Sequence, residues 1–577
     1  MEEQIFNEFA TACGEYINLA QLIEAIKKSG ICLDDPRLLD FKKQIEKHQE
    51  NQLDIETRQN QDIGRDEFHK IVKDSIDIIS RALNKAFVVP EFKQFQHMIE
   101  EIYKKCKKLE SGLLPEFIPL LKKNYKNQFA VSVCTIDGQR FGLGDCDTGL
   151  SLQACFKPIA YAAALTELGS DYVHTYVGRE PSGKKSSEIS LDSESRPFNP
   201  FTNAGAIMTV SLLKPEMPID ERFNWFLKMF RKASGDMQVN FSNSSYLSEK
   251  TFGSDRNNAL AYFMKENNCY PKNSVESFHD SLDLYFQLSN LECSANALAV
   301  MGATLANGGV SPTKGERVFK TDMVKHVLSL MLSCGMYDYS GEFAFHTGIP
   351  AKSSISGALL VVIPNTCGIC IWSPPLDKHG CSVRGLDFCF ELIKKFNFHN
   401  FDSMLTCMGT GTDQLEKKVD PRKSAEDLDV HITQLLSAAK NGDLTGLRRF
   451  HIQNFDMDIS DYDGRTALHV SACEGHVHCI EYLVKICHCN PHAVDRWGST
   501  PLADAKRFGG SEAAECLEKY TERLSHVERR MSRVNYTADH KTIQELALKK
   551  LALKDDRRRQ FKEVLKNSKS RTFNTDD

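Results

Sequence analysis

The sequence predicts an α+β protein of several domains, and three observations lead to this prediction. A chain of 577 residues is longer than one hydrophobic core organises, so more than one domain is expected. Strand-like segments at 129–145 and 358–374 flank a stretch of Ala-rich helical segments, a pattern typical of a mixed domain of sheet and helices. Beyond residue 428, segments that begin at Gly464 and Gly498 repeat one pattern at an offset of 34 residues.

Composition excludes several classes of function. The apolar content of 41% and the charged content of 26% are ordinary for a soluble globular protein. A net charge of −5 provides no bulk attraction to nucleic acid or to an anionic membrane surface. The chain lacks a run of about 18 apolar residues, so we expect no membrane-spanning segment.

The cysteines and the N-terminus indicate the compartment. The 19 cysteines are scattered without the spacing of a disulfide framework, which favours reduced thiols in an intracellular protein. The first residues, "MEEQIFNEF", are acidic, whereas a mitochondrial transit peptide is rich in Arg and poor in acidic residues. We therefore predict a cytoplasmic protein; a mitochondrial location is the alternative if a presequence is missing.

Residues 1–110 are predicted to form a helical, EF-hand-like domain. The stretches "NLAQLIEAIKKSG" and "DEFHKIVKDSIDIISRALNKAF" place apolar residues at i, i+3, i+4 and i+7. The stretch "DIGRDEF" resembles part of a calcium-binding loop, but it lacks alternating oxygen ligands closed by a late Glu. We expect this domain to bind no calcium.

Residues 115–405 are predicted to form the mixed domain. A strand, a turn at Asp137-Gly138 and a second strand open it, and "ALLVVIPNTCGICIWSP" repeats the arrangement near its end. Ala-rich helices such as "PIAYAAALTEL" and "SANALAVMGATLANGG" lie between. We expect the strands at the two ends of the segment to pair in one antiparallel sheet.

Three segments complete the chain. Residues 406–427 are predicted to be a linker. Residues 428–520 resemble ankyrin repeats, because both repeated segments begin Gly-x-Thr-x-Leu and continue as two short helices. This array predicts a surface that binds a protein partner, whose identity the sequence does not reveal. The tail, 521–577, is charged and predicted to be partly helical around "TIQELALKKLALK" and otherwise disordered.

A lysine at the start of a helix points to acyl-transfer chemistry. In serine hydrolases of the β-lactamase and penicillin-binding class, a Ser-x-x-Lys motif opens a helix, and the lysine takes the proton of the serine. Here Lys157 follows strand-turn-strand and opens a helix, but the residue three before it is Ala154. Such folds also carry Lys-Ser/Thr-Gly on a later strand, and "AKSSISG" offers Lys352-Ser353 at that place.

Longer motifs extend this likeness. The stretches that carry it are "VSVCTIDGQR", "LQACFKP", "YVGREPSG", "NPFTNAGAI", "SDRNNALAYF", "MGATLANGG", "SCGMYDYSGEFAFHTGIPAKS" and "WSPPLDKHG". In these the chain resembles the serine-dependent, β-lactamase-like glutaminases, and its domain order resembles that of the animal members with ankyrin repeats. The resemblance implies hydrolysis of L-glutamine to L-glutamate and ammonia through a serine acyl-enzyme, without a cofactor. It also implies tetramers that polymerise into filaments and, as in animal members, activation by inorganic phosphate.

The resemblance assigns roles to matching positions. Lys157 corresponds to the general base and Tyr337 to the tyrosine that relays protons beside it. The substrate-holding positions are Asn203, Glu249, Asn257 and Tyr285, and the oxyanion hole consists of the backbone N–H groups of residues 154 and 355 (Ile355). Taken alone, these residues allow ordinary alternatives: the two asparagines as helix caps, the two tyrosines as core aromatics and Glu249 as a solvated surface acid.

Two departures from the family pattern remove hydroxyl groups. Ala154 stands at the position of the nucleophilic serine, and Phe117 stands at the position of an active-site tyrosine. In addition, Ser354 replaces a glycine and Ile355 replaces a valine. These changes predict strongly impaired turnover, because losing the nucleophile costs roughly 10⁶ in kcat.

We do not expect a neighbouring residue to replace the serine. Cys155 is turned by about 100° around the helix from Ala154, and Ser151 is predicted to be a helix N-cap. Two hypotheses remain. The first is a glutaminase whose hydrolysis is either retained by an unexpected route or lost only in this copy, as by deliberate inactivation. The second is a non-catalytic member that binds glutamine or joins active subunits in mixed oligomers. Because an engineered inactivation needs Ala154 alone, Phe117 favours the second.

No metal site is predicted. Cys367-x-x-Cys370 is a single pair in a strand-like run. The His and Cys residues of the repeat region fit the start of a helix and its surroundings; they are His476, His478, Cys487, His488 and Cys489.

Overall fold

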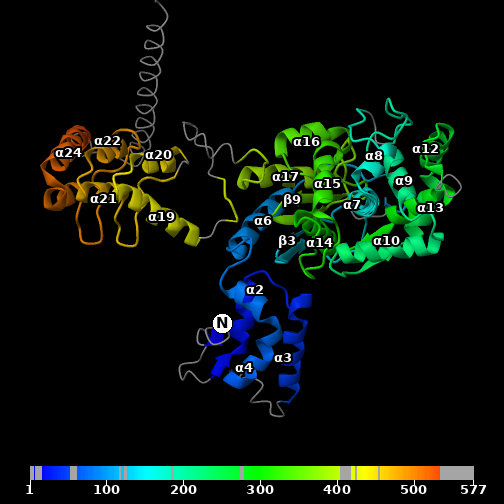
Figure 1. Cartoon of the computed structure of the whole chain (residues 1–577), viewed down its shortest axis with the longest axis horizontal. Coiled ribbons are helices and arrows are strands. Elements are labelled where there is room, and N and C mark those ends of the chain that lie inside the picture. Colours follow the sequence, from blue (N-terminus) through cyan, green and yellow to red (C-terminus); the bar gives the residue numbers. More distant parts are fainter. Residues whose placement is uncertain are drawn as a thin grey trace, which may run out of the picture. The chain divides into compact units, whose positions relative to one another are not determined.

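The computed structural model describes most of the chain in two units, Met1–Leu428 and Asp429–Asp577, and each is described here by itself (Figure 1). The described residues are 5, 6, 9, 16–51, 62–115, 118–121, 126–183, 187–272, 278–402, 418–422, 425–452 and 455–532. Phe117, most of the predicted linker and the helix predicted around 542–554 lie outside these residues.

The N-terminal region is a helical bundle with one small strand pair. Its helices are α2 (Leu19–Lys28), α3 (Leu39–Asn51), α4 (Arg65–Val72) and α5 (Ile76–Leu83). Strands β1 (Tyr16–Asn18) and β2 (Asp62–Gly64) pair antiparallel, with Ile17 opposite Ile63. Strands of three residues are too short to show an alternating pattern, so the sequence carries no signal for this pair.

A five-stranded antiparallel sheet forms the centre of the first unit. Its order is β4-β3-β10-β9-β8, with the bounds β3 Ala130–Thr135, β4 Arg140–Gly144, β8 Ala351–Ser353, β9 Ala358–Ile363 and β10 Cys367–Trp372. Strand β10 pairs with β3 and with β9, so the two ends of the segment share one sheet, as the sequence predicts.

Helices bury both faces of this sheet, which explains its continuous apolar strands. Leu360 and Val362 of β9 belong to the core that contains α14 (Ala295–Ala306). The alternate residues Leu359 and Val361 belong to the core that contains α6 (Phe92–Cys106) and α17 (Val383–Lys395). This is the predicted α+β, β-lactamase-like class of fold.

Helix α6 extends the mixed domain toward the N-terminus. Its apolar residues Phe92, Phe95, Ile99 and Ile102 pack with the sheet, whereas the N-terminal core ends at Phe87. The core of the mixed domain therefore includes a helix that precedes residue 110. An apolar stripe fits either neighbour equally well, so the sequence alone could not assign this helix.

A second, largely helical part lies beside the sheet. Its helices are α7 (Phe156–Leu168), α8 (Ser170–Tyr176), α9 (Asn203–Leu212), α10 (Ile219–Ala233), α11 (Asn243–Phe252), α12 (Asp255–Glu266) and α13 (Phe278–Ser289). This part also contains a three-stranded sheet in the order β5-β7-β6. Its strands are β5 (Leu150–Ser151), β7 (Leu291–Cys293) and β6 (Val239–Phe241). Helices α15 (Thr321–Cys334) and α16 (Ser340–Thr347) precede β8.

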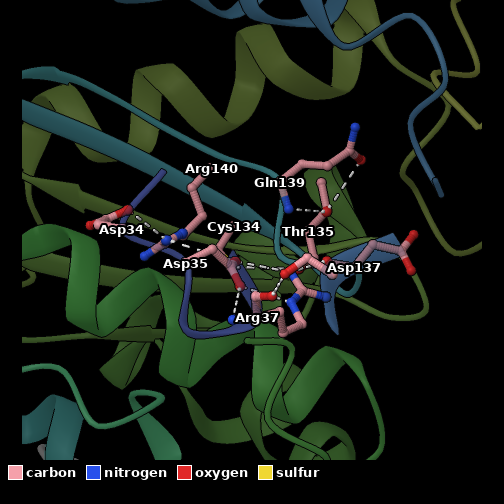
Figure 2. Close-up of polar contacts among 9 residues, drawn as sticks. Asp34, Asp35, Arg37, Cys134, Thr135, Asp137, Gln139 and Arg140 are labelled. Atoms are coloured by element: carbon pink, nitrogen blue, oxygen red, sulfur yellow. Dashed lines mark hydrogen bonds and ion pairs between the residues drawn. The ribbon is translucent and has the colours of Figure 1, made fainter. Parts of the chain in front are cut away.

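The turn between β3 and β4 joins the sheet to the N-terminal helices (Figure 2). Arg37 binds the carboxylate of Asp35 through Nε (2.8 Å) and Nη2, and its Nη2 also donates to the backbone oxygen of Asp137 (2.8 Å). The carboxylate of Asp137 accepts from Arg81 Nη2 and from the backbone N–H of Val88.

Gln139 completes this junction from within the core. Its side chain is 1% exposed, and its Nε2 donates to the backbone oxygens of Ser29 (2.7 Å) and Val89 (3.0 Å). One buried amide therefore satisfies carbonyl groups of two N-terminal segments.

The second unit is an ankyrin array. Its helices are α19 (Ala425–Lys440), α20 (Leu444–Ile452), α21 (Ala467–Cys473), α22 (Val477–Lys485), α23 (Pro501–Asp504) and α24 (Gly510–Ser532), with a π-helical turn at Ala505–Gly509. Thr466 and Thr500 cap α21 and α23 through their side chains, and Gly464 and Gly498 have positive φ angles of 76° and 79°. The left-handed backbone conformation requires a glycine and the cap requires a side-chain oxygen, which together explain the repeated Gly-x-Thr.

None of the described helices is long and apolar enough to cross a membrane.

We predict that Gln139→Leu lowers the free energy of unfolding by about 1–3 kcal/mol, because the carbonyls of Ser29 and Val89 lose a buried donor. Urea unfolding measures the change. Gln238→Leu, at an exposed position, is the matched control and should shift stability by less than about 0.5 kcal/mol. Equal effects of the two substitutions would contradict the role of Gln139 in the junction.

Candidate active site

Ala154 lies on a strained turn between β5 and α7. Residues Gln153–Cys155 form a single 3-10 turn, and Gln153 has a φ of 42°, in the left-handed region that few side chains adopt. Backbone strain of this kind is concentrated at functional sites. The methyl group of Ala154 is 9% exposed.

The lysine of α7 is buried beside this turn. Lys157 is 3% exposed, and its Nζ donates to the backbone oxygen of Phe201 (3.0 Å) and to Oδ1 of Asn203 (2.8 Å). Burial lowers the pKa of Lys157 well below its ordinary value; the charge of Lys352 lowers it further, and that of Glu249 opposes the change. A neutral amine with both N–H groups engaged retains a free lone pair, which is what a general base requires.

A row of amides continues from the lysine. Asn203 Nδ2 donates to Oδ1 of Asn257 at 3.0 Å. Neither asparagine is a helix cap: Thr202 caps α9, and Asn257 lies inside α12. The structure therefore brings Lys157, Asn203 and Asn257 together in one hydrogen-bonded chain.

Glu249 lies on α11 and is buried, not a solvated surface acid. It is 5% exposed, and its Oε2 accepts from Gln153 Nε2 (3.1 Å) and from Asn290 Nδ2 (2.6 Å). Burial raises the pKa of Glu249, while the two amide donors and the charge of Lys157 act in the opposite direction. Sequence reasoning missed Gln153 and Asn290.

Tyr337 lies at the other side of the site with a second buried lysine. Its φ is 54°, and its buried hydroxyl has no hydrogen-bond partner among the described residues. Burial raises the pKa of Tyr337, and the backbone of Ile355 opposes this change. The ammonium of Lys352 lies 4.3 Å from the centre of the Tyr337 ring.

Lys352 itself is fully buried, and no carboxylate of the described residues forms an ion pair with it. Its Nζ donates to the backbone oxygens of Gly335 (3.1 Å) and Ser353 (2.6 Å). Burial lowers the pKa of Lys352 to about 8 from its ordinary value of 10.5.

Ser354, which departs from the family pattern, links the end of β8 to the turn that carries Ala154. Ser354 is fully buried, and its hydroxyl donates to the backbone oxygen of Leu152 (2.9 Å) and contacts the hydroxyl of Ser356 at the same distance. The residue after β8 is thereby tied to the turn that carries Ala154.

Tyr285 lies in the same region on α13. Its ring packs edge-to-face on Phe156, with the centroids 5.6 Å apart, and burial and the charge of Glu249 raise its pKa. Phe117 lies outside the described residues; close after it in the chain, the backbone N–H of Leu120 donates to Ser248 Oγ of α11 at 3.4 Å.

The two neighbouring nucleophiles considered as replacements form hydrogen bonds with backbone oxygens. Cys155 Sγ contacts the backbone oxygens of Lys352 (3.5 Å) and Ala358 (3.9 Å), and burial raises its pKa to about 12. The prediction that Ser151 is an N-cap was wrong: it lies in β5 and donates to the backbone oxygen of Ser289, and a strand of two residues is too short to show an alternating pattern.

Comparison with known proteins decides the family. A family model described as glutaminase matches residues 112–401, one described as an EF-hand domain matches 1–90, and one described as ankyrin repeats (3 copies) matches 435–525. The chain is 42% identical to the mitochondrial liver isoform of glutaminase from Rattus norvegicus over 507 residues, covering 88% of this chain and 82% of that protein. The chain belongs to the glutaminase family.

Bacterial glutaminases match the mixed domain. A glutaminase from Nostoc sp. is 42% identical over 309 residues, which cover 53% of this chain and 90% of that protein. A solved structure, Mglu in its native form, is 33% identical over 52% of this chain and 71% of that chain, with a TM-score of 0.49. The animal relative, in contrast, extends across the flanking domains of this glutaminase-family chain as well.

Metal-ligating side chains do not converge in this member of the family. Cys367 and Cys370 point to opposite faces of β10, into the two separate cores. Within the described part of the chain, no group of three or more His, Cys, Asp or Glu residues could hold a metal ion.

We predict that Lys352→Met removes a pH dependence of stability. Between about pH 8 and 10.5 the unfolded chain binds more protons at residue 352 than the folded chain, so the stability of the unsubstituted protein rises with pH across this window. Relative to the variant, the gain should be about 3 kcal/mol, measured by urea unfolding at several pH values. Lys325→Met, at an exposed position, should leave the profile unchanged, and a variant with the original pH profile would contradict the prediction.

Proposed function

We propose that this glutaminase-family protein binds L-glutamine beside Lys157 and hydrolyses it very slowly, because a methyl group occupies the nucleophile position. The observation that carries the proposal is the pairing of a buried, hydrogen-bonded Lys157 with Ala154. The proton acceptor is in place, and residue 154 offers it no hydroxyl to deprotonate.

The family reaction explains what is lost. A serine hydroxyl would attack the side-chain amide carbon of glutamine, Lys157 would take the proton, and ammonia would leave from the tetrahedral intermediate. Water would then hydrolyse the acyl-enzyme to release glutamate. With Ala154 the first bond cannot form, which costs roughly 10⁶ in kcat, or about 8 kcal/mol of activation free energy.

The groups that bind glutamine remain. The carboxylate of Glu249 suits the α-ammonium of an amino acid, and Asn203 and Asn257 offer amide groups to its polar ends. The backbone N–H groups of residues 154 and 355 are independent of side chains, so they can still bind the amide oxygen of glutamine.

A second candidate function is a non-catalytic subunit in mixed oligomers with active glutaminases. It is favoured by the absence of two site hydroxyls, at Ala154 and Phe117, where one replacement suffices to stop catalysis. The further proposals rest on the resemblance: a tetramer that extends into filaments, a response to inorganic phosphate, and a protein partner for the ankyrin repeats.

We predict that the unsubstituted protein releases ammonia from L-glutamine about 10⁵–10⁶ times more slowly than the double variant Ala154→Ser, Phe117→Tyr. A coupled glutamate assay on both purified proteins measures the ratio. Ala154→Gly, which also lacks a hydroxyl, is the matched control and should remain inactive. Equal rates for the unsubstituted protein and the double variant would refute the proposal.

We predict that L-glutamine raises the melting temperature of the unsubstituted protein, because a ligand stabilises the state that it binds. At a ligand concentration of 100 times Kd, the free energy of unfolding rises by about 2.7 kcal/mol. Glu249→Gln should abolish this shift, because the ammonium of the ligand loses its carboxylate. Glu342→Gln, on an exposed face of α16, should preserve it. A shift that survives Glu249→Gln would show that glutamine binds elsewhere.

A further inference from the structure

Asn290 lies at the centre of the polar network beneath the candidate site. It connects α13 to β7 and is fully buried. Its Nδ2 donates to Oε2 of Glu249 (2.6 Å) and to the backbone oxygen of Phe286 (2.9 Å), while its Oδ1 accepts from Nε2 of Gln153 (3.1 Å). Both functions of one amide are therefore in use, and two of its three bonds reach side chains at the site.

The network is asymmetric with respect to the carboxylate of Glu249. Gln153 Nε2 and Asn290 Nδ2 both donate to Oε2, at 3.1 and 2.6 Å. Oε1 has no hydrogen bond from the described residues. A carboxylate held by two donors on one oxygen presents the other oxygen, with its lone pairs, in a fixed direction.

The same network supports the charge of Glu249. Burial of a carboxylate favours its neutral form, and hydrogen bonds to the ionised form oppose that tendency. The groups acting against burial at Glu249 are Gln153, Asn290 and the charge of Lys157. Asn290 also fixes Gln153 through Oδ1, so the loss of Asn290 would loosen both amide donors at once.

We propose that Asn290 is a positioning residue that fixes Glu249 so that Oε1 receives the α-ammonium of the bound amino acid. Asn290 would thereby set the preference for an amino acid over the same acid without its amino group. This inference rests on the proposed binding of glutamine. It differs from an ordinary core role, in which a buried amide supports the fold without affecting one group of the ligand more than another.

The test compares two ligands that differ only in the α-amino group: L-glutamine and glutaramate, measured by isothermal titration calorimetry on the full chain. Asn290→Leu should weaken the binding of L-glutamine about 10- to 100-fold, because a lost hydrogen bond to a charged group changes affinity by this amount. The binding of glutaramate should weaken less than about threefold in the same variant, because this ligand has no ammonium for Glu249 to bind. Asn290→Asp, which keeps the shape and places a second carboxylate beside Glu249, is the alternative if the leucine variant does not fold, and the same split is expected.

The matched control is Asn307→Asp. That amide donates to the backbone oxygen of Val310 and has no hydrogen bond to Glu249 or Gln153, so both affinities should be unchanged. In a Glu249→Gln background, Asn290→Leu should cause no further loss of L-glutamine affinity. An equal loss for both ligands, or no loss for either, would overturn the inference.

A measurement without ligand separates this inference from the proposed function. If the unsubstituted protein binds neither ligand, the proposed binding of glutamine fails. The carboxyl carbon signal of Glu249 in an NMR titration, assigned with Glu249→Gln, still reports on Asn290. Its titration midpoint should move to higher pH in Asn290→Leu, and an unchanged midpoint would overturn the positioning role.

Discussion

The burial of the Lys157 amine is the constraint on which the site depends. A lysine with no carboxylate partner is tolerated in the interior because the backbone oxygen of Phe201 and Oδ1 of Asn203 accept its two hydrogen bonds. These bonds require α7 and α9 to lie in contact near Lys157. The hydrogen bond from Asn203 to Asn257 requires α12 to lie beside α9 as well. Lys352 is a second amine in the same interior, and burial lowers the pKa of both lysines, so the site favours their neutral forms.

Two junctions give this site a stable frame. The five-stranded sheet is buried on both faces, and β8 leads directly into Ser354, whose hydroxyl reaches the backbone before Ala154. At the opposite edge of the sheet, the turn at Asp137 is bound by the N-terminal helices. The turn that carries Ala154 is thus attached to regular structure on both sides, to β8 through Ser354 and to α7 that follows it.

Much of the architecture could be predicted from the sequence, because it depends on local patterns. Apolar strands at both ends of the mixed domain, the helix that opens at Lys157 and the Gly-x-Thr of the repeats each have a signal within a few residues. The sequence could not assign α6, because an apolar stripe does not identify its neighbour. It also offered no signal for Asn290 in "LSNLEC", since that role arises where α13, α11 and the turn at Gln153 meet.

The thiols of the interior have a consequence for the chemical behaviour of the folded chain. Cys367 and Cys370 lie on opposite faces of β10, and burial raises the pKa of each thiol. Because the thiolate is the reactive form, such sulfur atoms are nearly inert toward oxidants and alkylating reagents while the sheet is intact. Burial therefore protects these two thiols from oxidation, and they lose this protection when the strands of the sheet separate.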